Sequence, residues 1–144
     1  MKPKLNCIIN TEEKYMKNLL SIILILIANS LYAHGMNELG PNKGYISMPG
    51  TFHTELVPSQ NGELKIYLLD INFEGPMTEK SSVKLSYTDL KDKINYECKA
   101  LKDYFSCTSS KKVDLNKGKL LLNAVRNNVK ATSVAEYQLP LSLK

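Results

Sequence analysis

The sequence FHTELVPSQNGELKIYLLDIN, residues 52–72, holds two strand-like runs on either side of Asn61-Gly62. Asn followed by Gly tolerates the positive φ angles of a type I′ hairpin turn. In the second run apolar residues alternate with Lys65 and Tyr67, a period of two that is typical of a strand with one buried and one solvated face. The stretch therefore predicts a β-hairpin with strands over Phe52–Pro58 and Glu63–Asn72.

Six further segments between residue 34 and the C-terminus have the same character, and each is bounded by turn residues. No ten-residue stretch there has helical periodicity. So many half-apolar strands are covered by stacking two sheets or by closing one. We predict an all-β fold for residues 34–144, an immunoglobulin-like β-sandwich or small barrel of seven to eight strands in a single domain. The six segments are Tyr45–Met48, Ser82–Tyr87, Lys93–Lys99, Tyr104–Thr108, Lys119–Arg126 and Ala135–Leu143.

The N-terminal part has the order of a secretory signal peptide. The apolar run LLSIILILIA, residues 19–28, follows Lys17 and precedes small residues. It is shorter than the roughly 20 apolar residues that span a bilayer, so we expect no membrane insertion after cleavage. We expect an upstream extension over 1–15, a start at Met16 and a signal peptide over 16–33, with cleavage after Ala33 or, alternatively, after Ser30. The sequence therefore predicts a periplasmic or secreted protein.

The two cysteines outside residues 1–33 fit this compartment. Cys98 and Cys107 are an even pair in a chain expected to reach an oxidising space. They lie symmetrically about Lys102-Asp103, so a hairpin there would bring them opposite each other. We predict a structural disulfide between them. The absence of a C-x-x-C spacing argues against a thioredoxin-type role.

Composition and motifs disfavour two function classes. The 19 Lys and Arg against 14 Asp and Glu give a net charge of +5. The lysines alternate with acidic residues and only one Arg is present, whereas nucleic-acid binders concentrate basic residues on one face. The sequence has no Gly-x-Ser-x-Gly elbow, no phosphate loop and no evident acidic pair. We therefore expect neither a nucleic-acid partner nor an enzyme.

The only two histidines, His34 and His53, lie within 20 residues of each other. If cleavage follows Ala33, the free α-amino group and imidazole of His34 can chelate one Cu(II), and His53 adds a third nitrogen. Met36 and Met48 lie in the same stretch, and their thioethers are soft ligands that suit Cu(I). These residues predict a copper site made of His34, His53, Met36 and Met48.

Two other interpretations of these residues stay open. Zinc is less favoured, because it would need a third His, a thiolate or a carboxylate, which Glu38 or Glu55 could supply. Without any metal, His53 would be a half-exposed or hydrogen-bonded residue of its strand. Met48, before Pro49, would then fill the edge of the core.

Three segments carry a resemblance to a known group of proteins. Gly40-Pro41-Asn42-Lys43-Gly44, Gly50–Val57 and Gly62–Asp70 resemble small periplasmic proteins of heavy-metal efflux systems. They are similar as well to the N-terminal β domain of the periplasmic adaptor subunits of metal-efflux pumps. The resemblance implies a β-sandwich, copper or related metal handling, and a periplasmic efflux-pump component as partner. Asn42 stands where that pattern has its first His, and Lys43 where it has its second Gly. Copper-resistance sandwich proteins whose mature chain begins with His are a looser parallel for His34.

Together these observations predict a secreted or periplasmic metal-binding protein. It would bind copper and either sequester the ion or pass it to an efflux component. The alternative is a metal-free β-sandwich that serves as a protein-interaction module of the cell envelope. The metal's identity and oxidation state, the partner and the oligomeric state stay open at this point.

Overall fold

A computed structural model describes residues 39–143, and these residues form ten β-strands and no helix. The all-β prediction is confirmed, but the predicted number of seven to eight strands is wrong. No helix in the described part of the chain is long and apolar enough to cross a membrane. The expected extension over 1–15 and signal peptide over 16–33 lie outside the described residues. The strands are β1 (Tyr45–Ser47), β2 (His53–Pro58), β3 (Leu64–Leu69), β4 (Ser82–Thr88), β5 (Lys93–Asn95), β6 (Glu97–Ala100), β7 (Phe105–Thr108), β8 (Lys119–Arg126), β9 (Val129–Lys130) and β10 (Ala135–Gln138).

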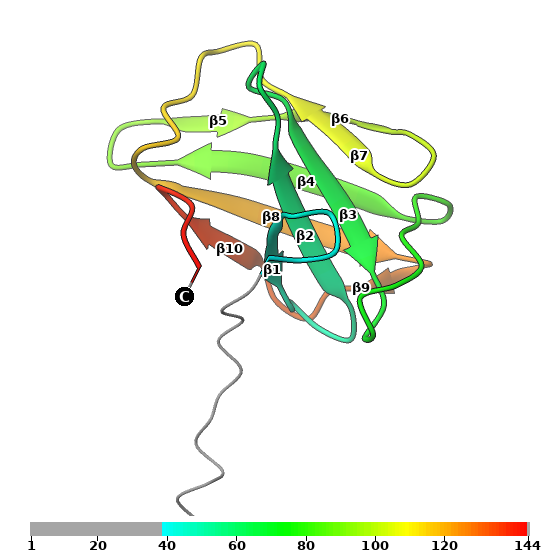
Figure 1. The fold of residues 1–144 in the computed structure, drawn as a ribbon. Coiled ribbons are helices and arrows are strands. Elements are labelled where there is room, and N and C mark those ends of the chain that lie inside the picture. Colours follow the sequence, from blue (N-terminus) through cyan, green and yellow to red (C-terminus); the bar gives the residue numbers. More distant parts are fainter. Residues whose placement is uncertain (1–38, 144) are drawn as a thin grey trace, which may run out of the picture. The chain divides into compact units, whose positions relative to one another are not determined.

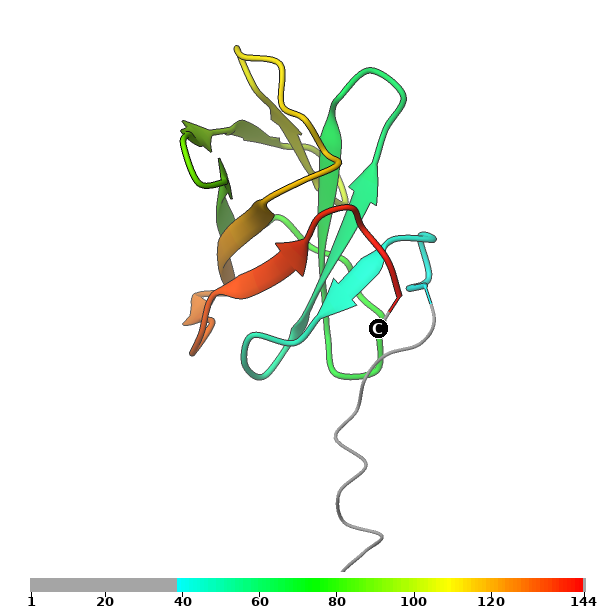
Figure 2. The same cartoon turned by 90° about the vertical axis from the view of Figure 1, so that its left-hand side faces the viewer.

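The strands form two antiparallel sheets. The first has the order β1-β2-β3-β7-β6 and the second β10-β8-β4-β5, with β9 paired to β8. The two sheets lie face to face, as in a β-sandwich (Figures 1 and 2). The described residues belong to one compact unit.

The core lies between the two sheets and follows the period of two in the strands. In β3, Leu64, Ile66 and Leu68 are fully buried, while Lys65 and Tyr67 between them are partly exposed. The predicted alternation of this strand is therefore confirmed. The second sheet contributes Leu85, Tyr87, Leu120, Leu122, Ala124, Ala135 and Tyr137 to the same cluster.

The predicted hairpin is confirmed, but its turn is longer than a type I′ turn. β2 and β3 pair antiparallel from His53 opposite Leu69 to Pro58 opposite Leu64. Residues 59–63 connect them, closed by a hydrogen bond from the Ser59 N–H to the Glu63 carbonyl. Gly62 alone has positive φ, at 76°, whereas type I′ requires it at both central residues. Gly62 is thus needed for its positive φ, but it lies in a five-residue loop instead of a two-residue type I′ turn.

The predicted strand over Lys93–Lys99 is two strands in different sheets. Tyr96 separates β5 from β6 and is buried, and its N–H donates to the Leu85 carbonyl in the second sheet. One residue later, Glu97 pairs with Thr108 in the first sheet. The chain therefore crosses between sheets at Tyr96. This break and the two-residue strand β9 raise the number of strands to ten.

The predicted disulfide is confirmed. Cys98 of β6 lies directly opposite Cys107 of β7. Their sulfur atoms are bonded, and their Cα atoms are 4.0 Å apart. The bond joins the edge strand of the first sheet to its neighbour.

Candidate functional site

His53 begins β2 and points away from the core of the sandwich. Thr54, the next residue, lies in the core, where its Oγ1 is 2.6 Å from the hydroxyl oxygen of Tyr137. Because side chains alternate along a strand, His53 and Glu55 lie together on the outer face of the first sheet. His53 is nevertheless only 4% exposed. Loops over the outer face therefore cover it.

The first covering contact determines which ring nitrogen of His53 carries the proton. Nδ1 of His53 is 2.9 Å from the backbone carbonyl oxygen of Asp70. A carbonyl oxygen only accepts hydrogen bonds, so Nδ1 is the donor. In the neutral ring Nε2 then carries a free lone pair, which is the arrangement that metal-binding histidines use. This contact therefore leaves Nε2, and not Nδ1, as the ring nitrogen with an available lone pair.

The second covering contact is an aromatic stack. The rings of His53 and Phe73 have centroids 4.0 Å apart and planes inclined by 23°. Phe73 has φ of 65°, an uncommon conformation for a bulky residue and one that recurs at functional sites. The lone pair of Nε2 lies in the plane of the imidazole ring. Stacking on the ring face therefore restrains His53 without occupying the direction in which a ligand would bind.

The turn after β3 carries both contacts and is held by Asp70. The Asp70 carboxylate accepts hydrogen bonds from the N–H groups of Asn72 and Glu74, each at 2.9 Å. The Glu74 N–H, followed by that of Asn72, holds the pKa of the Asp70 carboxyl below its usual range. Arg126, the terminal residue of β8, donates to the carbonyls of Leu68 and Gly75 at 3.2 and 2.8 Å. The second sheet thereby braces the turn that positions His53.

Glu55, two residues along the same face, anchors the loop that precedes β1. Its fully buried carboxylate accepts hydrogen bonds from the backbone N–H of Asn42, from Nδ2 of Asn42 and from the backbone N–H of Gly44, all at 2.8 Å. A Cβ on Gly40 would lie 2.7 Å from this carboxylate, so the loop packs directly on it. Both carboxylate oxygens of Glu55 thus hold the loop before β1, which argues against Glu55 as the carboxylate ligand of a zinc site. Glu38, the other carboxylate considered for such a site, lies outside the described residues.

Met48 lies at the same end of the sheet as His53. It follows β1, and extending the pairing of Ser47 with Thr54 by one step places Met48 opposite His53. Met48 is 49% exposed, and its neighbour Pro49 is buried instead. Its expected alternative role as a filler of the core edge is therefore wrong.

The described residues do not form the whole predicted ligand set. His34 and Met36 lie outside residues 39–143, so the structure bears only on His53 and Met48. Within that range no three His, Cys, Asp or Glu side chains group closely enough to hold a metal ion. Sequence reasoning missed the two residues that restrain His53, Asp70 through its carbonyl and Phe73 through its ring. Neither contact leaves a motif in the sequence.

Comparison with known proteins adds no assignment, because no family model, no curated protein and no solved structure matches the chain.

Proposed function

We propose that this chain is an exported copper-binding protein with His53 Nε2 as its central ligand. The observation that carries the proposal is the hydrogen bond from Nδ1 of His53 to the Asp70 carbonyl. It leaves Nε2 as the free nitrogen, while the Phe73 stack restrains the ring. A neutral imidazole held through its other nitrogen is the usual form of a histidine metal ligand.

The remaining ligands in this proposal are Met48 and the residues just before the described part, His34 and Met36. The packing of Gly40 against Glu55 supports this, because Glu55 is two residues from His53 on the same face, about 7 Å along the strand. Six residues of extended chain reach at most about 20 Å. His34 and Met36 are therefore close enough in sequence to Gly40 to reach Nε2.

The proposed role is binding rather than catalysis, in the periplasm or outside the cell. The protein would sequester copper or hand it to an efflux component, with thioethers favouring Cu(I) and the α-amino group of His34 favouring Cu(II). The immunoglobulin-like form of the sandwich belongs to the same proposal. It is supported by the two antiparallel sheets and by the crossing between them at Tyr96.

The experiment that tests this function is a Cu(I) competition titration of residues 34–144. His53→Asn is the decisive variant, because its side-chain NH2 can still donate to the Asp70 carbonyl while the Nε2 ligand is lost. We expect one copper per chain and an affinity at least about tenfold lower in His53→Asn. Lys99→Gln, a change on the edge strand β6, serves as the control and should leave the affinity unchanged. Equal affinities of wild type and His53→Asn would refute the proposed site.

A specific observation favours the second candidate, a metal-free interaction module. Met48, Ile71 and Val134 are exposed apolar side chains, at 49, 53 and 41%. They come from three loops that gather at one end of the sandwich (Figure 1), where the Pro49 carbonyl accepts a hydrogen bond from the Ser133 N–H. Apolar side chains exposed on neighbouring loops are a feature of protein-contact surfaces. A chain that binds no copper would be assigned this role.

A further inference from the structure

The loop between β2 and β3 contains a chemically labile pair of residues. Asn61 is the one asparagine of the chain that is followed by a glycine. The backbone nitrogen of the residue after an asparagine can attack the carbon of the side-chain amide, and a side chain on that residue hinders the attack. Glycine has no Cβ and permits the close approach that the reaction needs. The sequence therefore offers one favourable place for this reaction, at Asn61-Gly62.

The structure leaves this pair open to solvent. The loop projects from one end of the first sheet (Figure 2), and both Asn61 and Gly62 are exposed. Apart from its chain neighbours, no heavy atom lies within 4 Å of the position that a Cβ on Gly62 would take. Water and hydroxide therefore reach both the amide of Asn61 and the backbone nitrogen of Gly62.

Few contacts hold the reacting groups apart. The Gly62 N–H donates to the Ser59 carbonyl at 3.3 Å, which is longer than the usual range for such a bond. In Asn42 and Asn116, by contrast, Nδ2 donates to a carboxylate at 2.8 and 2.9 Å. Among residues 39–143 no hydrogen bond holds the side chain of Asn61 in this way. A rotation that brings this side chain over the Gly62 nitrogen therefore breaks one long hydrogen bond.

We propose that Asn61 is a site of spontaneous deamidation. The Gly62 nitrogen loses its proton to hydroxide and forms a bond to Cγ of Asn61, the Cγ–Nδ2 bond breaks, and ammonia leaves a cyclic imide. One water then opens the ring. Opening at Cγ gives aspartate, whereas opening at the backbone carbonyl carbon gives isoaspartate, whose main chain runs through Cβ and Cγ. The net reaction consumes one water, releases one ammonia and replaces a neutral amide by a carboxylate.

The modification leaves the rest of the sandwich in place. The pairing of β2 with β3 begins beyond the loop, at Pro58 opposite Leu64, and an exposed loop accommodates an added main-chain atom. His53 lies at the far end of the same hairpin, opposite Leu69. The proposal is therefore independent of the copper site. The share of modified chains grows with time after synthesis, and each modified chain carries one more negative charge.

The test is incubation of residues 34–144 at neutral pH and physiological temperature, followed by peptide mapping with mass spectrometry. All ten strands lie between Tyr45 and Gln138, so the processed chain retains the folded unit. An isoaspartyl carboxyl methyltransferase with a labelled methyl donor detects the isoaspartate product. We expect Asn61 to react at least about tenfold faster than Asn127 and Asn128, which are exposed in a turn but are not followed by glycine.

Two variants and a free peptide make the test specific. Gly62→Ala should slow the reaction at Asn61 at least about tenfold, because the added Cβ hinders the attack. Gln60→Ala, at an exposed neighbour in the same loop, serves as the control and should change the rate by less than about threefold. The rate in the folded chain should lie within about tenfold of that in a peptide of residues 57–65, because one hydrogen bond opposes the rotation.

Three results would overturn the proposal. The first is a rate at Asn61 no higher than at Asn127 and Asn128. The second is an unchanged rate in Gly62→Ala. The third is a rate in the folded chain more than about tenfold below that of the peptide, because the loop would then protect the pair.

Discussion

Replacing Glu55 by Ala should cost a large share of the stability of this domain. The carboxylate accepts three hydrogen bonds at 2.8 Å in a fully buried position. In Glu55→Ala the N–H of Gly44, a buried residue, is left unpaired, at about 2 kcal/mol. The two donors of half-buried Asn42 can turn to water, and losing their bonds adds about 1 kcal/mol. The free energy of unfolding should therefore fall by about 3 kcal/mol, measured by urea unfolding followed by circular dichroism.

Two further variants separate this anchoring from a general effect of charge removal. Glu55→Gln keeps one acceptor oxygen but turns an NH2 group toward Nδ2 of Asn42, so about 1 kcal/mol should be lost. Glu136→Ala removes the exposed partner of Lys119, 3.1 Å away, and should cost about 0.5 kcal/mol or less. If Glu55→Ala unfolds within about 0.5 kcal/mol of Glu136→Ala, the anchoring of the loop before β1 is refuted.

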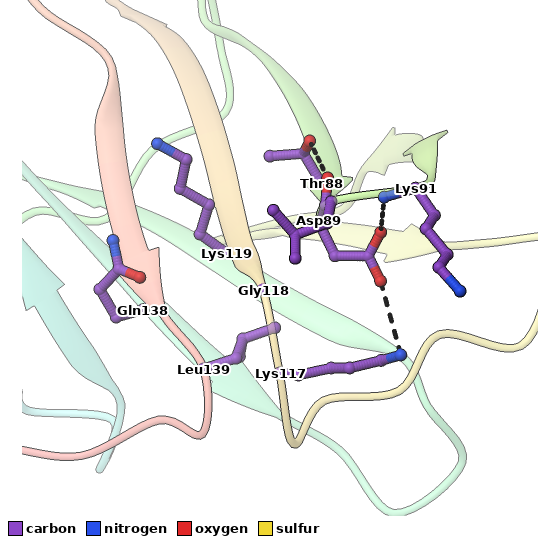
Figure 3. Close-up of a pocket in the computed structure, with 9 residues that line it drawn as sticks. Thr88, Asp89, Lys91, Lys117, Gly118, Lys119, Gln138 and Leu139 are labelled. Carbon is purple, nitrogen blue, oxygen red and sulfur yellow. Dashed lines mark hydrogen bonds and ion pairs between the residues drawn. The ribbon is translucent and has the colours of Figure 1, made fainter.

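Two other predictions concern Gly118 and Asp89, which lie close together at the end of β4 (Figure 3). Gly118 has φ of 81°, and a Cβ there would lie 2.6 Å from a backbone oxygen of β4, so Gly118→Ala should lower the free energy of unfolding by about 3 kcal/mol. Gly62→Ala, at φ of 76° with nothing within 4 Å, should lower it by only about 1 kcal/mol; equal losses in urea unfolding would contradict the steric argument. The N–H groups of Asp92 and Lys91 lower the pKa of the Asp89 carboxyl from 3.8 to about 2, so its contribution to stability is complete above about pH 5 and is lost as the pH falls through about 2. The difference in urea midpoint between wild type and Asp89→Asn should shrink over that range, and a constant difference would show that the ionised carboxylate does not act in this way.

Local sequence patterns predicted most of the strands. They failed where contacts between residues distant in sequence determine a strand's boundaries or the sheet it joins. The alternation in Leu64–Leu69 and the facing cysteines depend on short-range geometry, and both predictions are confirmed. The predicted strand over Lys93–Lys99 is broken because Tyr96 bonds to one sheet and Glu97 to the other, and a period of two does not reveal the pairing partner. The predicted strand over Ala135–Leu143 ends early at Gln138, shortly before Pro140, which cannot donate a ladder hydrogen bond.

The candidate site was only partly predictable for the same reason. The scarcity of histidine draws attention to His53, but its burial depends on Phe73, twenty residues later, whose ring reaches back over β2 from a turn with positive φ. Asp70 contributes a backbone carbonyl, and such a contact carries no sequence signal. Glu55, considered above as a possible zinc ligand, anchors a loop instead, because the N–H groups around it appear only in the folded chain.

The most direct test of the copper proposal is the tautomer of His53 and its response to metal. Long-range ¹H–¹⁵N spectra of residues 34–144 distinguish the two ring nitrogens, and the chain has only two histidines, so His34→Ala completes the assignment. We predict that His53 is protonated at Nδ1 without metal, and that one equivalent of Cu(I) shifts its Nε2 resonance while Nδ1 stays protonated. A proton on Nε2, or an Nε2 resonance that does not move when copper is added, would contradict it.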